Sequence, residues 1–391
     1  MSFIKIPDGW EKVKLGDICE VITGNTPSKK YKEYYDGIYP WVNPSHLDKE
    51  KYISDSDEYL SDLGVNQARL LPANSVLVSC IGYIGKVAIN RIPMCTNQQI
   101  NALIPSKKVI PEFLLYSIKK YRNRLQLLAS NTAVDIINKS NFSKFQIPLP
   151  PLDVQERIVE ILDKAERLKE LQKESIKKSE ELRSSMFQKV INPFIGKKTV
   201  KLKDIFSEKP QYGTSKKANS NKLGLKILRM GNIQNGRLDL SDIKHVEMAS
   251  EETEKFKLLN NDILYNRTNS IDHVGKSAIF DLNENFIFAG YLVRLRINKD
   301  KANPKFINMY INSHLGKSYI RRSLVKAIGM VNINPKIMGE MNIFLPPLNT
   351  QNKFIEKIDF LEKIEKQKNI SNIDINKLTS SLFQKAFNGE L

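Results

Sequence analysis

Loops that combine cationic and amide side chains with an occasional aromatic ring stand out in the first half of the chain. Arginine, lysine, asparagine and glutamine are the side chains that reach base edges and phosphates in nucleic acids. Two segments have this composition, one after the turn at Gly24 to Pro27 and one close to Lys86: Lys29, Lys30, Tyr31 and Lys32, then Asn97, Gln98 and Gln99. The chemistry they suit is non-covalent binding of a polyanion, and a solvated lysine-rich loop is the alternative for each residue.

The second half of the chain has a parallel set of such loops. Its members are Lys216, Lys217, Asn219 and Asn221, then Arg229, Asn232 and Arg237, then Asn266, Arg267, Asn269 and Lys276. Two cations follow a glycine, in Gly85-Lys86 and Gly275-Lys276, which is the sequence of a tight turn that presents a cation. Loss of a phosphate contact at such a turn would weaken binding equally for all sequences, and a purely structural hairpin turn is the alternative.

The overall charge agrees with a polyanionic partner. Lysine and arginine number 61 against 43 aspartate and glutamate residues, so the formal net charge is +18, and the isoelectric point is near 9.5. Nucleic acid is the leading candidate on this ground. The alternative is that a lysine-rich genome produces basic proteins without any nucleic-acid role.

No catalytic centre is evident in the sequence. Residues 192–194, Asn-Pro-Phe, have one proline too few for the N-P-P-aromatic motif of adenine methyltransferases, and no glycine-rich loop precedes them. Residues 242–244, Asp-Ile-Lys, lack a nearby P-D partner for a nuclease, so solvated charge is the better interpretation. There is no G-x-x-x-x-G-K-[ST] loop and no nucleophile elbow around Cys80. The sequence therefore predicts a protein without catalytic residues.

Cysteine and histidine usage predicts a reduced, metal-free cytoplasmic protein. The three cysteines form no C-x-x-C pair, and the four histidines have no metal-ligand spacing. No basic-then-apolar signal segment opens the sequence, and no apolar run approaches the roughly 18 residues that span a bilayer. Neither secretion nor membrane insertion is expected.

The sequence contains an internal repeat. IPLPPLDVQERIVEILD from Ile147 and IFLPPLNTQNKFIEKID from Ile343 align at a constant offset of 196, and the ungapped correspondence continues to the strings SMFQK and SLFQK. Weaker matches upstream, such as VKLGDI with VKLKDI, have offsets that drift from 187 to 196, so insertions fall in loops. The strings IINKS and NINPK precede the two proline pairs, and Asn138 and Asn334 in them are interpreted as structural. Each half is thus a variable domain followed by a helix.

Each repeat block predicts a long amphipathic helix. A Pro-Pro pair cannot lie inside a helix because proline lacks the amide donor, so the helices can begin at Leu152 and Leu348. Apolar residues recur mainly every third or fourth position, with Asn369, Ser371 and Asn372 weakening the middle of the second helix. A helix of about 38 residues is about 57 Å long. We expect the apolar faces of the two helices to pack against each other in an antiparallel coiled coil. The alternative is two short helices that pack on their own domains.

The variable domains have an α+β pattern. The sequences of residues 75–89 and 261–280 each predict two strands joined by a turn. One helix is expected near residues 111–128, with a counterpart at 304–324. The predicted organisation is a variable domain at residues 1–148, a helix at 149–190, a second variable domain at 191–344 and a C-terminal helix at 345–391. The repeat would relate the two halves by a pseudo-two-fold axis.

This organisation resembles the specificity subunits of type I restriction-modification systems. The likeness covers the whole chain and rests on the motif at Ile147, its copy at Ile343, ILRMGNIQNG from Ile227, and LNNDILYNR from Leu259 with VGK downstream. The resemblance implies two target recognition domains for double-stranded DNA, with paired helices that hold them apart and bind two modification subunits. Restriction subunits would join through the complex. S-adenosylmethionine, ATP and magnesium are implied in the partner subunits, and no cofactor in this one.

A rigid spacer would fix the base-pair spacing between two half-sites, and the different loops of the two domains predict an asymmetric target. A rival interpretation is a coiled-coil adaptor whose charge is incidental, which predicts no salt-dependent DNA affinity. A further one is the specificity part of a nuclease-methylase fusion, which neighbouring coding sequences would settle.

Overall fold

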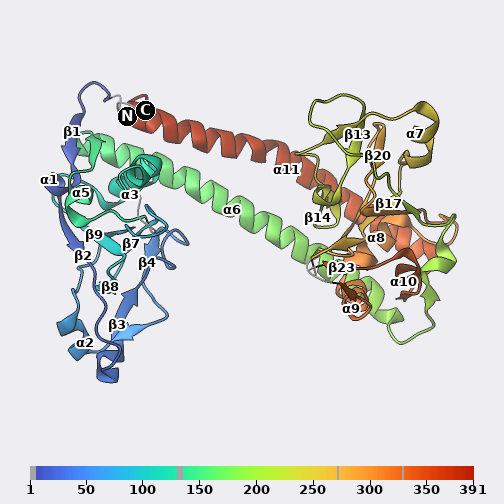
Figure 1. The fold of residues 1–391 in the computed structure, drawn as a ribbon, viewed down its shortest axis with the longest axis horizontal. Coiled ribbons are helices and arrows are strands. Elements are labelled where there is room, and N and C mark those ends of the chain that lie inside the picture. Colours follow the sequence, from blue (N-terminus) through green and yellow to red (C-terminus); the bar gives the residue numbers. More distant parts are fainter. Residues whose placement is uncertain (1–5, 130–134, 271–272, 328–329) are drawn as a thin grey trace. The chain divides into compact units, whose positions relative to one another are not determined.

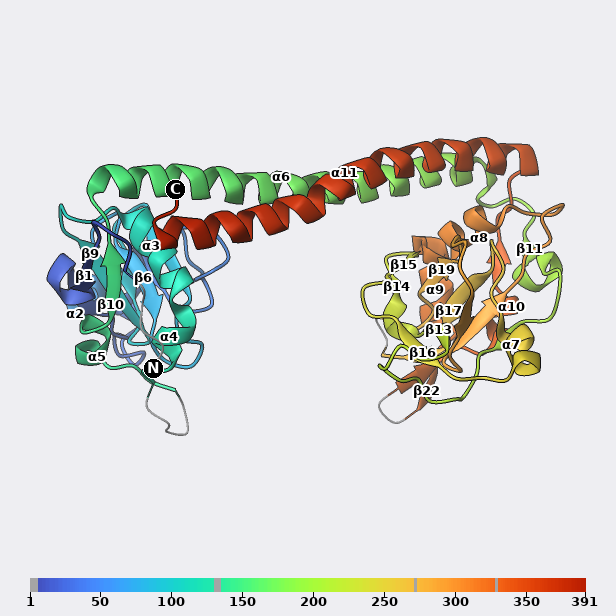
Figure 2. The same ribbon diagram turned by 90° about the horizontal axis from the view of Figure 1, so that it is seen from above.

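The chain forms two compact units, each of which combines segments that are far apart in the sequence. The computed structural model describes residues 6–129, 135–270, 273–327 and 330–391. The first unit contains the chain up to Lys173 together with Ile370–Leu391, and the second contains Glu174–Asn369. Both units mix helices and sheets, as the α+β pattern predicts (Figures 1 and 2). In the described part of the chain, no helix is long and apolar enough to cross a membrane.

The first unit is built around a sheet of order β2-β9-β6-β7-β4. These strands are β2 (Cys19–Thr23), β9 (Ile100–Pro105), β6 (Val76–Ser79), β7 (Val87–Asn90) and β4 (Tyr52–Ile53). A smaller sheet of order β5-β3-β8 and a strand pair complete the β structure: β5 (Tyr59–Leu60), β3 (Tyr35–Val42), β8 (Cys95–Thr96), then β1 (Glu11–Lys14) with β10 (Gln146–Leu149). The short helices are α1 (Leu15–Ile18), η1 (Lys32–Tyr34), α2 (Asp62–Gln67), α3 (Pro111–Lys120), α4 (Arg122–Gln126) and α5 (Lys139–Ser143).

The second unit has a sheet of order β12-β21-β17-β19 and several smaller ones. The main strands are β12 (Gln211–Tyr212), β21 (Leu292–Leu295), β17 (Ile263–Asn266) and β19 (Ser277–Ile279). The smaller sheets contain β16 (Lys244–Val246), β13 (Leu225–Leu228) and β20 (Phe286–Phe288); β18 (Thr268–Asn269), β23 (Met330–Asn332) and β22 (Val325–Ala327); β14 (Ile233–Gln234) and β15 (Arg237–Leu238); β11 (Val200–Lys201) and β24 (Asn342–Ile343). The short helices are η2 (Asn192–Phe194), η3 (Leu202–Ile205), η4 (Met230–Asn232), α7 (Ser250–Phe256), α8 (Pro304–Asn312), α9 (His314–Arg322) and α10 (Pro335–Gly339).

Two long helices, α6 (Leu152–Ile191) and α11 (Leu348–Asn388), begin at the residues that follow the proline pairs, as predicted. Each helix starts in one unit and ends in the other. The backbone of α11 stays helical through residues 369–372, so the polar residues there do not interrupt it.

Repeat-related residues of the two helices fill the two cores. In the first unit, Ile158 and Leu162 of α6 share a buried cluster with Ala386 and Phe387 of α11. In the second unit the residues 196 positions away come from the opposite helices: Phe354 and Ile358 of α11 share a buried cluster with Ile191 of α6, and Val190 packs against it. The duplication detected in the sequence is thus also a duplication of the core.

Within the second unit, the end of α6 and the start of α11 run antiparallel. Arg183 forms an ion pair with Glu365, whereas Phe187, one turn further along α6, has its ring 6.0 Å from that of Phe354. As the residue number increases along α6, the residue number of its contact on α11 decreases. This is the direction that the sequence predicts for the helix pair.

A buried glutamine fixes the start of each long helix. The amide of Gln155 accepts a hydrogen bond from the Ile110 backbone N–H (2.9 Å) and donates to the carbonyl of Pro150 (2.8 Å). Gln351, its counterpart in the repeat, accepts from the Asn303 N–H (2.9 Å) and donates in the same way to the carbonyl of Pro346, the first proline of its own pair (2.7 Å). Both glutamines are fully buried. Each therefore ties its helix to the segment that precedes α3 or α8.

The similarity of the two halves extends into the variable domains, where the side chains differ most. The N–H of Cys80 donates to the carbonyl of Gln99 (2.8 Å), and the carbonyl of Cys80 accepts from Ile137 (2.9 Å). In the second unit Arg267 makes the same pair of bonds, to Tyr291 (3.0 Å) and from Ile333 (2.9 Å). The two units therefore share one backbone hydrogen-bond scaffold.

Two local predictions are confirmed and one is corrected. The predicted hairpins are the antiparallel pairs β6-β7 and β17-β19. Asn138 and Asn334 are structural, because each caps a short helix by accepting a backbone hydrogen bond (2.8 and 2.9 Å). The single helices predicted at 111–128 and 304–324 are wrong: each is two helices, since Tyr121 has a non-helical backbone and the Ser313 hydroxyl caps a new helix.

Candidate nucleic-acid interface

The segment Lys29 to Lys32 is exposed and lies between β2 and β3. Lys29 lies over the Trp41 ring (5.9 Å to the centroid) and 3.6 Å from Glu58. Among the described residues, Lys30 and Lys32 have no ion-pair partner. Tyr31 is half exposed and packs against Tyr34. This segment therefore offers two unpaired cations and an aromatic ring to solvent.

In the polar cluster at Asn97 to Gln99, one side chain is buried and another is exposed to solvent. Asn97 is buried; its amide accepts from the Gln99 N–H (3.0 Å) and donates to the Gln99 side chain (2.9 Å). Gln98 is exposed and accepts a hydrogen bond from the Thr26 hydroxyl. That bond brings the loop before Lys29 beside Gln98, so these two predicted segments lie together.

Lys86 follows a tight turn, as predicted, and Gly85 has a positive φ of 84° that favours glycine. The ammonium group of Lys86 lies 5.1 Å from the centre of the Tyr83 ring, and Tyr83 is 80% exposed. Because Cys80 in the same hairpin bonds to Gln99, the hairpin adjoins the polar cluster. Tyr83 was missed by the sequence analysis, and its available signal is an aromatic residue directly after the turn glycine Gly82.

The loop from Lys216 to Asn221 in the second unit is exposed over most of its length. Lys216 forms an ion pair with Glu252, whereas Lys217 has none among the described residues. The side chain of Asn219 accepts from the backbone N–H of Asn221 (3.2 Å), which shapes the loop itself. Among the described residues of this group, Lys217 and the exposed Asn221 side chain remain available to a ligand.

Arg229, Asn232 and Arg237 are occupied by contacts within the protein. Asn232 is buried and accepts from the Arg229 N–H (2.9 Å). Arg229 pairs with Asp242 (2.7 Å), and Arg237 pairs with two glutamates of α11 (3.0 and 3.1 Å). Hydrogen bonds from Arg229 and Lys244 lower the pKa of Asp242, which fits the interpretation of residues 242–244 as solvated charge. The structure therefore gives these cations partners within the protein.

Asn266, Arg267 and Lys276 lie at one end of the main sheet of the second unit. Asn266 is buried, and its side-chain oxygen has no hydrogen-bond partner in the described part of the chain. Arg267 lies over the Tyr212 ring, with 4.9 Å between the guanidinium carbon and the ring centre. Lys276 is partly buried and follows Gly275, whose φ of 75° is again left-handed. The side chain of Asn269 lies outside the described residues, and its backbone belongs to β18.

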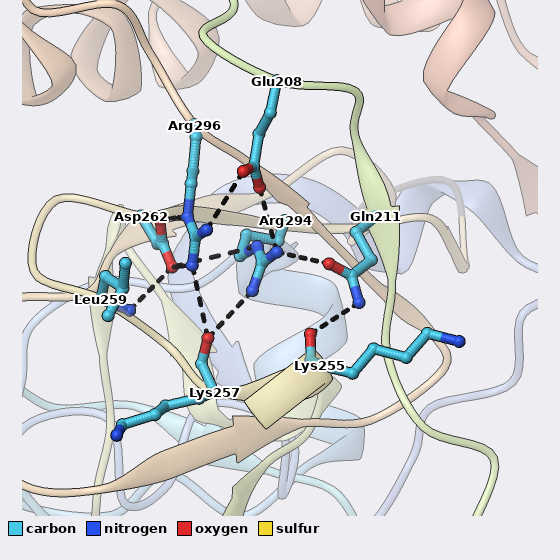
Figure 3. A network of polar contacts seen from close by, with 8 residues as sticks. All are labelled: Glu208, Gln211, Lys255, Lys257, Leu259, Asp262, Arg294 and Arg296. Carbon is cyan, nitrogen blue, oxygen red and sulfur yellow. Dashed lines mark hydrogen bonds and ion pairs between the residues drawn. The ribbon is translucent and has the colours of Figure 1, made fainter. Parts of the chain in front are cut away.

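A largely buried network of ion pairs and hydrogen bonds supports this sheet (Figure 3). Gln211 pairs with Arg294 and Tyr212 with Val293, so the network lies on the face opposite Tyr212. Arg294 of β21 donates to the carbonyl of Lys257 (2.9 Å), to Glu208 (3.0 Å) and to the Gln211 side chain. Gln211 in turn donates to the carbonyl of Lys255 (2.7 Å). Because β12 is only two residues long, this anchoring of Gln211 also fixes its neighbour Tyr212.

Asp262 completes the network. It accepts from Arg296 (2.7 Å) and from the Leu259 N–H (2.8 Å), and it is almost fully buried (Figure 3). Burial lowers the pKa of the Arg294 guanidinium. The equivalent strand of the first unit has Ala102 and Ile104 in place of the two arginines, so the network is particular to the second unit.

These features define a protein made of two copies of one α+β scaffold that present different polar side chains at matching places. The family model described as the type I restriction modification DNA specificity domain matches residues 7–181 and again residues 195–373. The chain belongs to this family, that of the type I restriction-modification specificity subunits.

Individual relatives agree with this assignment. The specificity subunit of the type I restriction enzyme EcoKI from Escherichia coli (strain K12) is 25% identical, over 100% of this chain and 91% of that protein. That of StySPI from Salmonella potsdam is also 25% identical, over 99% and 90%. A crystal structure of a type I restriction-modification S subunit from M. genitalium has the same fold, with a TM-score of 0.62, 14% identity and 98% coverage of both chains.

Proposed function

We propose that each unit of this chain reads one half of a split DNA target, and that the two half-sites differ in sequence. The observation that carries this proposal is the shared backbone scaffold with unlike side chains at matched positions. Cys80 and Gln99 in one unit stand where Arg267 and Tyr291 stand in the other. Base edges are distinguished by the hydrogen-bonding groups that face them, so different groups on the same scaffold select different bases.

We further propose that α6 and α11 form an antiparallel coiled coil that spaces the two units and gives the chain a pseudo-two-fold axis. The opposed direction of the helices in the second unit supports this arrangement, as does the use of repeat-related residues in the two cores. The length of such a spacer would set the number of base pairs between the half-sites.

The chain is proposed to be non-catalytic and to direct two modification subunits, with restriction subunits joining the complex. S-adenosylmethionine, ATP and magnesium would then be bound by those partners. Apolar side chains on the helices support a protein partner: Phe360 is 65% exposed and lines a hollow of about 410 Å³ with Met186 and Leu361. Exposed apolar patches of this kind commonly mark protein interfaces.

The test is to co-express the chain with its cognate modification subunits and to map methylated adenines across the genome. A second version carries residues 195–344 from an unrelated family member, a boundary that keeps the β11-β24 pair within the exchanged piece. We expect a split, asymmetric motif of which one half changes on exchange. Absence of any motif from the intact complex, together with no salt-dependent retardation of duplex DNA, would favour the coiled-coil adaptor.

A further inference from the structure

Two tyrosines, Tyr212 and Tyr265, lie beside Arg267 on one face of the β12-β21-β17-β19 sheet, and a third, Tyr291, bonds to Arg267 through its backbone. Tyr212 and Tyr265 both pair with Val293 of the strand between them, so their side chains share a face. Arg267 directly follows β17 at a bend; its guanidinium contact with the Tyr212 ring puts it beside this face, and its N–H bonds to the carbonyl of Tyr291 (3.0 Å). The three tyrosines come from separate segments, and strand pairing and this backbone bond bring them close to one cation.

The guanidinium of Arg267 has two contacts within the protein. It lies over the Tyr212 ring, and its Nε donates a long bond (3.4 Å) to the hydroxyl of Thr268. Within the described residues, neither terminal nitrogen has a hydrogen-bond partner. Tyr212 is 42% exposed and Tyr291 is 56% exposed, so the cluster reaches the surface. Arg267 itself is partly exposed, so its two terminal nitrogens, unpaired among the described residues, are available to a ligand.

The cluster also contains an unsatisfied polar group. The hydroxyl of Tyr265 is buried and has no hydrogen-bond partner among the described residues. Burial raises the pKa of this phenol, an effect that the nearby Arg267 cation partly offsets. Buried donors without partners are uncommon and mark places where a ligand or water completes the bonding.

The equivalent positions of the first unit are occupied by uncharged side chains. By the shared scaffold, Arg267 corresponds to Cys80, Tyr291 to Gln99, and Tyr212 to Thr23. There the Thr23 hydroxyl donates to Asn101 (2.7 Å) and the Gln99 side chain accepts from Asn97. The same backbone position therefore offers a cationic fork in one unit and an internally bonded polar set in the other.

We infer that Arg267 reads a guanine in the half-site bound by the second unit, through paired hydrogen bonds from its guanidinium to O6 and N7 of that base. This inference rests on the proposed function. A planar pair of donors fits the two acceptors that guanine presents in the major groove, and no other base presents the same pair. Tyr212 acts as a positioning residue, because it limits the directions in which the fork points.

The first part of the test is a methylation map of the full complex carrying Arg267→Ala or Arg267→Lys, with the exposed Arg321→Ala as a matched control in the same unit. We expect one guanine of the second half-site to become degenerate in the Arg267→Ala map, with a roughly 10- to 100-fold loss of discrimination, while the first half-site stays unchanged. Arg321→Ala should keep the parental motif. A parental second half-site without guanine, or an unchanged motif in Arg267→Ala, overturns the inference.

The second part uses DNA in which 7-deazaguanine replaces that guanine and removes the N7 acceptor. The parental complex should lose affinity for this duplex, whereas Arg267→Ala should bind both duplexes equally. Equal loss of affinity by both proteins would mean that Arg267 does not contact N7, and uniform weakening on all sequences would identify a phosphate contact instead. If the parental complex produced no motif at all, the proposed function itself would fail, which is a separate outcome.

Discussion

The side-chain oxygen of Gln155 accepts a 2.9 Å hydrogen bond from the backbone N–H of Ile110, and the glutamine is fully buried. Replacing Gln155 with alanine leaves that N–H and two carbonyls without partners, so we expect a loss of about 2 kcal/mol in the free energy of unfolding of the first unit. Urea unfolding followed by tryptophan fluorescence measures it, because Trp10 and Trp41 both belong to this unit.

The control for this change is Glu156→Ala, an exposed position of the same helix within the first unit. It should leave the unfolding midpoint unchanged. Equal effects of the two substitutions would mean that helix composition, and not the buried hydrogen bonds, determines the loss.

Phe387→Ala should destabilise the first unit although it lies at the far end of the sequence. The Phe387 ring is 2% exposed and lies 5.7 Å from that of Phe113. Removing a buried phenyl group typically costs about 3–5 kcal/mol. The same fluorescence measurement should give a clearly lower midpoint, and Phe360→Ala, which removes an exposed ring, should not. An unchanged midpoint for Phe387→Ala would contradict the assignment of this residue to the first core.

The stability of the first unit should fall in alkaline solution. Burial raises the pKa of the Cys95 thiol to about 11 and those of Cys19 and Cys80 to about 12, from an ordinary value of 9.0. Above pH 9 the thiols of the unfolded chain ionise while the folded ones do not, so stability present below pH 9 is lost as the pH rises toward 12. The loss is at most about 1.4 kcal/mol per thiol over one pH unit.

Urea midpoints at pH 8 and pH 10 test this expectation, with a variant in which alanine replaces all three cysteines as the control. The variant should show a smaller fall between the two pH values. An equal fall in both proteins would assign the pH dependence to other groups, such as the tyrosines.

Arg294→Ala should loosen the segment around Gln211. The substitution removes the donor that joins Glu208, Gln211 and the carbonyl of Lys257, and it leaves Asp262 in a buried place with one cation fewer. Breaking one partner of such a buried set typically costs about 3–5 kcal/mol. Hydrogen–deuterium exchange of peptides spanning residues 207–213 should accelerate, whereas the exposed Arg321→Ala should leave it unchanged.

Charge removal at Lys30 and Lys32 should weaken DNA binding without altering the motif. Both ammonium groups are exposed and have no ion-pair partner among the described residues, so phosphate contacts are their expected role. Replacing both with alanine should reduce the slope of log affinity against log salt by about 1.8. Lys164→Ala is the control, because Lys164 pairs with Glu160 on α6. A changed motif with an unchanged slope would instead make these lysines base-reading residues.

The sequence allowed the architecture to be predicted because its strongest signals are local. Proline pairs and a repeat with constant offset locate the starts of α6 and α11 to the residue, and the hairpin patterns locate β6-β7 and β17-β19. The break at Ser313 was missed because the apolar pattern continues across it, and the cap there is a single hydroxyl.

The candidate interface was only partly predictable, since residue type does not reveal which way a side chain faces. Asn97 and Asn232 are of a residue type that commonly contacts DNA bases, yet both are buried and hydrogen-bonded within their own loops. Tyr212 comes close to Arg267 only because β12 pairs with β21, some eighty residues further along the chain, and the sequence signals this only by a glycine beside Tyr212 and beside Tyr291.

The placement of Phe387 in the first core has a consequence for biosynthesis. A ribosome makes the strands of the first unit early, but the side chains that close its core, such as Ala386 and Phe387, are made only after the whole second unit. The earliest-made half must therefore wait for nearly the entire chain before it can complete its folding. A premature stop shortly before Phe387 would harm the N-terminal unit first and leave the later-made one largely intact.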